Sequence, residues 1–556
     1  MNDTHWIERL ERNSRRSAQI VAVLVKYGLA DWLRKIPANR IQEWLRDDHG
    51  QPIPDLSPPE RIRLALTELG TTFIKLGQML STRPDVMGQE LAHELERLQS
   101  QTPPDPPRTA QATVRKELGG SVKNLFAQFE PEPFASASIA QVHHARLHSG
   151  EEVVVKIQKH GIEEAIEADL SIMADLAALA EKHAPDLKRY RPVALIRQFT
   201  QGLRGELDFT RERRNLETFR NNFAGDGSVY FPHPCAELSS RRVLTMERLE
   251  GILISQTAKL RAHASDLNEF ARRGATMYLE MIFRDGFFHA DPHPGNLMLL
   301  EGDVLGVVDA GMVQHLDEGL REKLVDVLLA ASQGDAEALA DSVWALGSIP
   351  PAGSKEPLRT DLAEFLADYA GQSISEIHLS HALTSLTEII RRNDIFLPPN
   401  VSLLLRMVIE LEGTAQLLNP TFSLLDLIQP YCHKALARRF SPAQISRRLR
   451  RDAHIWRELM HQLPHDLKDL LEQIRGGTLS VHLEHRRLDP VVNRLVRGLV
   501  ASSLFLGSSL LWSMKAPPLI KGVSLFGVIG YVLALLIGLK LFRTVRRSED
   551  LRSNGQ

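Results

Sequence analysis

The amino-acid sequence predicts an α+β fold, in which a mixed region of strands and helices is enclosed by helical segments. Short apolar runs rich in β-branched residues occur between residues 126 and 250, as is typical of strands. Two more apolar runs, residues 297–300 and 304–308, flank a Glu-Gly-Asp turn in the pattern of a hairpin. Elsewhere, apolar residues mostly recur at helical spacing.

The composition excludes several classes of protein. The chain has 556 residues, 43% of them apolar, so it is neither a small disulfide-stapled module nor a disordered one. Its 67 Lys and Arg residues are balanced by 69 Asp and Glu residues, so no chain-wide basic field attracts nucleic acid, and no nucleic-acid partner is expected. Cys235 and Cys432 lack the spacing of a zinc or redox site, which favours a reducing compartment.

The N-terminal part of the chain is predicted to form two helical segments. Residues 1–57 are expected to be amphipathic, and both an ordinary amphipathic helix and an interfacial membrane helix fit their pattern. Residues 58–125 form a predicted helical extension. It starts with one long helix whose apolar residues recur from residue 62 to residue 80. Four prolines within residues 101–107 mark a boundary inside this extension.

The C-terminal end carries two uncharged apolar runs, residues 498–514 and 522–539. A helix that spans a bilayer needs roughly 17–25 apolar residues, so we expect residues 491–556 to form a transmembrane hairpin with a basic tail. A hairpin buried in a protein core is the alternative. More basic residues lie outside the two apolar runs than in the loop between them, so both ends of the hairpin are expected to be cytoplasmic. The chain is then a multi-pass membrane protein whose remaining domains face the cytoplasm.

Three separated motifs predict nucleotide chemistry. Residues 153–155 are valines followed by Lys156, the pattern of a strand that places an ammonium on nucleotide phosphates. Asp291 and Asn296 reproduce an H-x-D-x-x-x-x-N spacing, in which the aspartate orients or deprotonates the acceptor. Asp309 opens a D-x-G after the predicted hairpin. Asn296 and Asp309 supply the hard oxygen ligands that Mg²⁺ prefers, so the predicted cofactors are ATP and Mg²⁺.

The order of these motifs predicts a two-lobed, protein-kinase-like fold. Residues 126–250 are expected to form its N-lobe and residues 251–335 the core of its C-lobe. A helical C-terminal region, residues 336–490, follows; the sequence assigns it no role, and shielding of the core is the simplest one. A long helix over residues 193–223 is predicted within the N-lobe.

A kinase-like site also needs a carboxylate that holds the lysine. Glu206, Asp208 and Glu212 are the candidates in the predicted long helix. Asp208 and Glu212 share one helical face with Asn215, whereas Glu206 points elsewhere unless the helix bends. We therefore predict that Glu212 pairs with Lys156.

Two features of ordinary kinases are missing. The nucleotide loop contains no G-x-G-x-x-G and instead holds Ala135, Ser136, Ala137 and Ser138, whose small side chains still permit close approach of phosphates. A helical pattern over residues 316–331 follows Asp309 almost at once, which leaves no length for an activation loop. A bound peptide substrate therefore has no obvious platform.

The chain resembles the UbiB family of atypical protein-kinase-like proteins. The resemblance rests on the motifs above together with a K-x-G-Q motif at residues 75–78 and an E-x-D motif at residues 206–208. It implies that these two motifs occupy the space where an ordinary kinase takes its protein substrate. The residues concerned are Lys75, Gln78, Glu206 and Asp208. The resemblance also implies that the nucleotide is bound by Ala135, Ser136, Ala137, Ser138, Lys156 and Glu247.

Three functions are compatible with the motifs. The leading hypothesis is a membrane-anchored kinase or ATPase, located by resemblance in the bacterial inner membrane, that supports isoprenoid quinone (ubiquinone) biosynthesis. Membrane lipid, isoprenoid quinone precursors and quinone-biosynthesis enzymes are the partners that the resemblance implies. The second is an ATP-dependent lipid- or quinone-precursor-binding scaffold with little phosphotransfer. The third takes His289, Asp291 and His293 as the metal triad of a hydrolase, although Pro292 and Pro294 spoil the strand it needs.

Overall fold

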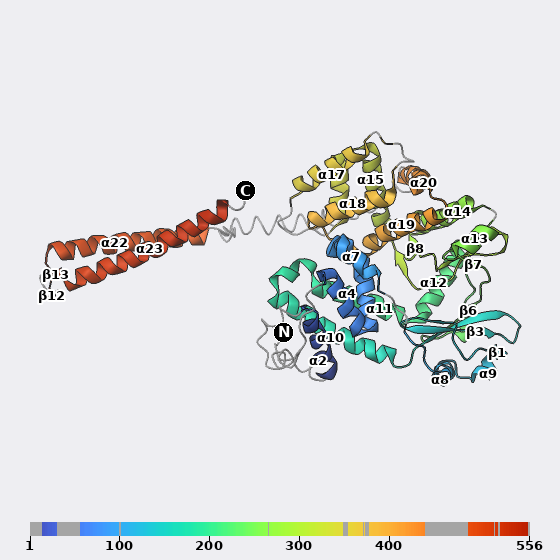
Figure 1. Cartoon of the computed structure of the whole chain (residues 1–556). Coiled ribbons are helices and arrows are strands. Elements are labelled where there is room, and N and C mark those ends of the chain that lie inside the picture. Colours follow the sequence, from blue (N-terminus) through green and yellow to red (C-terminus); the bar gives the residue numbers. More distant parts are fainter. Residues whose placement is uncertain are drawn as a thin grey trace, which may run out of the picture. The chain divides into compact units, whose positions relative to one another are not determined.

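The structure of the chain is a computed structural model (Figure 1). It divides into two compact units, residues 1–445 and residues 446–556, and each is described by itself. The structure describes residues 14–29, 56–98, 102–264, 266–347, 354–370, 372, 377–439, 488–515, 517–520 and 523–553. Much of the predicted segment 1–57 and residues 440–487 of the predicted helical region therefore lie outside the described residues.

The N-lobe is built on a five-stranded antiparallel sheet in the order β1-β3-β4-β6, with β2 paired to β3. Its strands are β1 (Gln128–Phe129), β2 (Ala135–Ser136), β3 (Ala140–Arg146), β4 (Glu152–Gln158) and β6 (Val243–Glu247). Alternate side chains of β4 face opposite ways. Val153 and Val155 pack with Val114 of helix α8 on one face, and Val154 joins the core shared with the C-lobe on the other. Lys156 shares the Val154 face and therefore points between the lobes.

The helical extension precedes this sheet and packs on the N-lobe helices. Its helices are α4 (Pro58–Leu69), α5 (Thr71–Ser81), α6 (Pro84–Met87), α7 (Gln89–Glu96), α8 (Pro107–Leu118) and α9 (Val122–Leu125), with α2 (Ser14–Lys26) before them. The prediction of one helix from residue 62 to residue 80 is wrong, because Gly70 adopts φ 91° and divides it into α4 and α5. A positive φ is easy for glycine and costly for other residues, so the break is encoded locally.

Three helices connect β4 to β6: α10 (Ile162–His183), α11 (Pro192–Glu206) and α12 (Phe209–Asn222). The predicted single helix over residues 193–223 is likewise wrong. Asp208 adopts an extended conformation, and its side chain accepts a hydrogen bond from the Thr210 amide, which makes it the N-cap of α12. Aspartate is among the best N-cap residues, because it satisfies an amide that has no partner within the helix. The chain therefore turns between α11 and α12 and changes the directions in which Glu206 and Glu212 project.

The C-lobe contains helices α13 (Thr257–His263) and α14 (Leu267–Glu280) together with short strands, two of which precede α13 in the sequence. These strands are β5 (Val229–Tyr230), β7 (Ile252–Leu253), β8 (Phe287–His289), β9 (Leu297–Leu299), β10 (Leu305–Val307) and β11 (Val313–His315). The predicted hairpin is confirmed, because β9 and β10 pair antiparallel. β8 pairs with β11, and helix α15 starts at Glu318, so the chain from Asp309 to Glu318 has no room for an activation loop.

The remainder of the first unit is helical. Its helices are α15 (Glu318–Gln333), α16 (Ala336–Leu346), α17 (Glu356–Tyr369), α18 (Leu379–Arg392), α19 (Pro399–Leu418) and α20 (Leu424–Arg439). Figure 1 shows them on the C-lobe side, where α19 lies beside α14. Met407, Leu411 and Leu418 of α19 belong to the same buried apolar cluster as Phe288 of β8. This packing places α19 along the strand that leads into the predicted catalytic loop.

The second unit contains two paired helices, α22 (Leu488–Ser513) and α23 (Leu525–Ser553), joined by the short strands β12 (Leu519–Ile520) and β13 (Val523–Ser524). Many of its apolar side chains face outwards, among them Leu506 at 64% and Leu535 at 65% exposed. The predicted helical pair is therefore present. Within the part of the chain that the structure describes, no helix reaches the length and apolar character needed to cross a membrane.

Gly77, the glycine of the K-x-G-Q motif, lies where α5 packs closest to its neighbours. A Cβ atom at this position would overlap Leu98 and would approach Leu66 to 2.9 Å. We expect Gly77→Ala to lower the free energy of unfolding by about 1–3 kcal/mol, as is usual for overpacking of a well-packed site. Gly413→Ala on α19 is the control, because a Cβ there meets no atom within 4 Å. Chemical denaturation of both variants measures the difference. Equal stabilities would contradict this close packing.

Candidate functional site

A buried ion pair lies between the two lobes. Lys156 Nζ of β4 donates to Glu212 Oε1 and Oε2 of α12, at 3.0 and 2.9 Å. The Glu212 side chain is only 6% exposed. Burial would lower the pKa of Lys156, but Asp309 and Glu212 outweigh burial and raise it. Burial raises the pKa of Glu212, although Lys156 opposes this. The predicted pair is confirmed, and Glu212 depends on Lys156 as its counter-charge.

Asp309 joins this pair from the C-lobe. Its Oδ2 lies 3.1 Å from Lys156 Nζ, and its Oδ1 accepts a hydrogen bond of 2.7 Å from the Gly311 amide. Burial would raise the pKa of Asp309, but Lys156 and the Gly311 amide lower it to about 2. Asn215 Nδ2 of α12 donates to the Ala310 carbonyl at 2.9 Å. The D-x-G segment is thus held by both strand β4 and helix α12.

The predicted catalytic loop follows β8. Asn296 Nδ2 donates to Asp291 Oδ2 at 2.9 Å, and the Val308 amide donates to the Asn296 carbonyl at 2.9 Å, next to Asp309. His289 is fully buried, and burial lowers its pKa, although the charges of Asp309 and Asp291 oppose this. Its Nδ1 accepts a hydrogen bond from the Asp291 amide. The loop is therefore fixed by its own hydrogen bonds, with Asp291 held by Asn296.

Asn296 and Asp309 have oxygen atoms suited to a magnesium ion. Because Asn296 Nδ2 donates to Asp291, the Asn296 Oδ1 atom is left to accept or to coordinate. Asp309 keeps a carboxylate with the opposite charge to a cation, and its low pKa keeps it ionised. Both are hard oxygen donors of the kind that Mg²⁺ selects. These residues fit the predicted metal.

The alanine-rich loop connects β2 and β3. Ser136 Oγ donates to the Thr102 carbonyl at 2.8 Å, and the Ala137 amide donates to the Ala140 carbonyl at 2.8 Å. Ser138 is 3% exposed. The loop is thus a tight turn, in which the Ser136 hydroxyl is already bonded and Ala135 lies in strand β2. A role of these four residues with phosphates stays a prediction.

Glu247 is separate from this group. Its carboxylate accepts hydrogen bonds from the Tyr230 hydroxyl, at 3.0 and 2.8 Å, and from the His233 amide at 3.0 Å. It stands at the end of β6 opposite Val153, three residues before Lys156 on β4. Its predicted contact with the nucleotide stays a prediction, and its carboxylate already has partners.

The two family motifs meet directly. Lys75 Nζ of α5 lies 2.6 Å from Glu206 Oε2 at the end of α11. Gln78 Nε2 donates to the Leu98 carbonyl at 3.2 Å. Asp208 does not take part in the Lys75–Glu206 pair, because its side chain caps α12. The bend at Asp208 is what directs Glu206 towards α5 and Glu212 towards Lys156.

A cavity of about 740 Å³ opens in front of Asp291. Helix α5 contributes Lys75 and Gln78, and Ala137 and Ser138 come from the alanine-rich loop. Further parts of the wall come from α7, α11, α12, α19 and the segments 290–291 and 311–315. Residues of the helical extension and of the helical C-terminal region thus share one cavity with the predicted catalytic aspartate.

Three residues of α19 that the sequence did not indicate lie beside this site. Thr414 Oγ1 donates to the Pro292 carbonyl at 3.2 Å, directly after Asp291. Glu410 and Arg406 follow at successive turns, and Arg406 pairs with Glu410 and donates to Ser81 Oγ at 2.9 Å. The available signal was the recurrence of polar residues at every fourth position, 406, 410 and 414, which places them on one face of the helix. The helical region therefore contacts the catalytic loop rather than only shielding the core.

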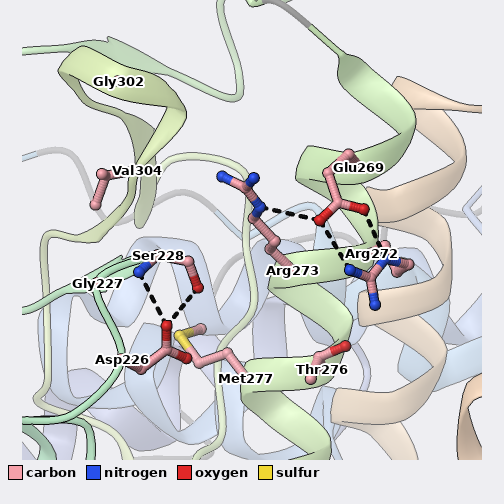
Figure 2. A pocket seen from close by; sticks show the side chains of 10 residues that line it. All are labelled: Asp226, Gly227, Ser228, Glu269, Arg272, Arg273, Thr276, Met277, Gly302 and Val304. Atoms are coloured by element: carbon pink, nitrogen blue, oxygen red, sulfur yellow. Dashed lines mark hydrogen bonds and ion pairs between the residues drawn. The ribbon is translucent and has the colours of Figure 1, made fainter.

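The structure does not support the hypothesis of a metal-dependent hydrolase, and a second pocket is not a candidate for the catalytic site. Among the described residues, no group of three or more His, Cys, Asp or Glu side chains is placed to hold a metal ion. A pocket of about 430 Å³ lies beside α14. Glu269 there pairs with both Arg272 and Arg273 (Figure 2). These ion pairs lower the pKa of Glu269 to about 2. This pocket contains none of the predicted catalytic or metal-binding residues.

The fold and the site define a protein-kinase-like domain. The ABC1 atypical kinase-like domain matches residues 97–343, the UbiB helical domain residues 362–423, and the ABC1/UbiB kinase-like C-terminal domain residues 482–547. The chain is 33% identical to the probable protein kinase UbiB of Marinobacter nauticus, over 77% of this chain and 79% of that protein. An uncharacterised protein of Clostridium pasteurianum is 31% identical, over 89% and 94% of the two chains. The chain belongs to the UbiB family of kinase-like proteins.

One solved structure was also found to be similar. It is the complex of Rv3197 with erythromycin from Mycobacterium tuberculosis, which is 24% identical to this chain. The match covers 64% of this chain and 90% of that protein, with a TM-score of 0.46.

Removal of the lysine tests the buried pair. Lys156→Gln leaves the Glu212 carboxylate buried without its cation, which we expect to cost about 3–5 kcal/mol at pH 8. The Glu212 pKa then rises further above its unfolded value. A carboxyl group whose pKa is raised in the folded state destabilises the fold only while it is ionised. The difference in free energy of unfolding between Lys156→Gln and wild type should therefore become smaller as the pH falls from 8 to 5. Denaturation at both pH values measures it.

The double variant Lys156→Gln/Glu212→Gln is the control for this experiment. It removes both charges, so it should be more stable than Lys156→Gln at pH 8. Its free energy of unfolding should also lack the additional pH dependence that the unpaired Glu212 carboxylate causes in Lys156→Gln. A difference between wild type and Lys156→Gln that is the same at both pH values would contradict the pairing.

Proposed function

We propose that the chain is an atypical kinase or ATPase that binds Mg·ATP between its lobes. The proposal rests mainly on one observation: Lys156 pairs with Glu212 and with Asp309 between the lobes, beside the Asp291–Asn296 loop. A lysine between two carboxylates is held in a fixed position, and its charge is suited to nucleotide phosphates. When bound, Mg²⁺ would neutralise charge on those phosphates.

Each side chain has a definite task in this proposal. Lys156 positions the phosphates, and Glu212 holds Lys156. Asn296 and Asp309 would hold the magnesium ion, and Asp291 orients the acceptor hydroxyl or water and takes up its proton. Catalysis then depends mainly on positioning and on neutralisation of charge, which a site with fixed dipoles and charges supplies without reorganisation.

The biological process is inferred from the family. Several similar proteins bear the name probable protein kinase UbiB, including one from Pseudomonas paraeruginosa that is 33% identical over 84% of this chain. We propose a role in isoprenoid quinone (ubiquinone) biosynthesis, with quinone precursors and quinone-biosynthesis enzymes as partners.

A second candidate function is an ATP-dependent lipid- or quinone-precursor-binding scaffold. The Lys75–Glu206 pair at the cavity and the short segment between Asp309 and α15 favour it, because neither leaves a platform for a peptide substrate. The two candidates differ in turnover: a scaffold binds Mg·ATP, whereas an ATPase also consumes it.

We also propose that the exterior of the α22–α23 pair contacts membrane lipid, in the bacterial inner membrane with the kinase-like unit on the cytoplasmic side. The support is the apolar character of the exposed side chains. Exposed apolar side chains are concentrated on both helices, for example Leu506, Leu510 and Leu535. A contiguous apolar exterior of this kind is a common mark of a membrane- or protein-binding surface.

Nucleotide binding and turnover are tested together on the full chain. Mg·ATP at about 100 times its Kd should stabilise the wild-type protein by about 2.7 kcal/mol, measured as a thermal shift. Asp309→Asn should lose the magnesium-dependent part of the shift. Asp291→Asn should keep the shift and lose turnover by about 10²- to 10⁴-fold, since it removes a general base.

Glu388→Gln is the control for this pair of measurements, because Glu388 binds Arg391 and Arg392 on α18, away from the cleft. A shift with no detectable hydrolysis or phosphotransfer in wild type would favour the scaffold. No shift in wild type would refute the nucleotide assignment.

Lipid contact is tested by vesicle flotation of the full chain. Leu506→Lys combined with Leu535→Lys should reduce flotation with vesicles, because each places a charge on the apolar exterior. Leu417→Lys makes the same change at an exposed leucine of α19 and should leave flotation unchanged. Equal flotation of all three proteins would contradict lipid contact through α22 and α23.

A further inference from the structure

One cation in the cavity in front of Asp291 has no ion-pair or hydrogen-bond partner among the residues that the structure describes. The other charged residues of this cavity are paired or hydrogen-bonded: Lys75 with Glu206, Arg406 with Glu410 and Glu96, and Asp291 with Asn296. Arg211 of α12 also lines the cavity, and its guanidinium forms no hydrogen bond or ion pair with any described residue. Arg211 is therefore the one Lys or Arg of the cavity lining without an ion-pair partner among the described residues.

Three other arginines near Arg211 in the sequence have partners. Arg204 pairs with Glu167 at 2.7 Å, and Arg213 pairs with Glu217. Arg214 donates to the Thr210 carbonyl at 3.2 Å and to its hydroxyl at 3.1 Å. None of these three lines the cavity. Among the four arginines of residues 204–214, the one that lines the cavity is thus the one without a partner among the described residues.

The backbone makes room for this side chain. The Arg211 guanidinium lies against Gly205 so closely that a Cβ atom on Gly205 would overlap it. Asn215, one turn further along α12, lines the same cavity and is bonded to the Ala310 carbonyl. The Arg211 side chain therefore lies against the end of α11. It is on the same side of α12 as Asn215, which binds the D-x-G segment.

The shape of the cavity limits the class of ligand. A volume of about 740 Å³ falls within the range of small-molecule sites, which is roughly 300–1,000 Å³. The cavity is closed on one side by α5 and on another by α19, and no activation loop is present to align a peptide. A free guanidinium recognises a carboxylate or phosphate group through charge-assisted hydrogen bonds.

We propose that this cavity is the acceptor site of the reaction and that it takes a small molecule with a hydroxyl group and an anionic group, the latter bound by Arg211. This inference rests on the proposed function. The acceptor oxygen forms a bond to the γ-phosphorus of ATP while the bond from that phosphorus to the β–γ bridging oxygen breaks. The hydroxyl proton passes to the Asp291 carboxylate, and ADP leaves with the broken bond's electron pair.

The test measures modification of arginines by phenylglyoxal in the wild-type full chain, mapped by mass spectrometry. The probes are benzoate and its uncharged analogue benzamide, each with and without a saturating non-hydrolysable Mg·ATP analogue. Binding of the analogue is checked in the same samples by thermal shift, so failure of nucleotide binding is recognised separately. We expect benzoate to slow modification of Arg211 by about tenfold in the presence of the analogue, whereas benzamide does not, because the contact depends on charge.

Arg214 is the internal control, since it lies on the same helix outside the cavity, and its modification should not respond to either probe. Arg211→Gln should weaken benzoate binding by a similar factor of about ten, and Arg214→Gln should not change it. Protection of Arg211 by the nucleotide analogue alone would assign Arg211 to the γ-phosphate and overturn the acceptor role. No protection by benzoate would also overturn it.

Discussion

The structure depends on one constraint, which is that a lysine buried between two lobes needs carboxylates from both sides. Lys156 comes from the N-lobe sheet, Glu212 from a helix, and Asp309 from the C-lobe. Loss of the cation would leave a buried carboxylate without compensation, and loss of both carboxylates would do the same to the lysine. The charges that compensate one another between the lobes are also those that phosphates and a metal ion would engage, so stability and nucleotide chemistry depend on the same atoms.

The bend at Asp208 lets two glutamates of one stretch of sequence, Glu206 and Glu212, project to different places. In a continuous helix, Glu206 and Glu212 would be separated by about 600° of rotation, which places them on different faces of one rod. With Asp208 as an N-cap, α11 ends at the cavity and α12 starts at the cleft. The E-x-D motif is thus a glutamate that binds Lys75, followed by an aspartate that makes the turn.

Much of the site was predictable from the sequence because its motifs are local. The Lys156–Glu212 pair followed from helical spacing, and the hairpin before Asp309 followed from its turn residues. The breaks at Gly70 and Asp208 were missed, because apolar periodicity continues across both, and a single glycine or aspartate inside a helical pattern is a weak signal. The contact of Thr414 with the catalytic loop joins residues far apart in the sequence, and tertiary packing of α19 alone produces it.

The most direct test of the central claim is to locate the metal ion in crystals of the full chain grown with a non-hydrolysable ATP analogue and Mn²⁺. Anomalous scattering identifies the manganese position without reference to the fold. The account predicts a peak within coordination distance of the Asp309 carboxylate and of Asn296 Oδ1, with the Lys156 ammonium on the phosphates. A nucleotide and metal bound elsewhere, for example against the paired arginines of α14, would contradict it.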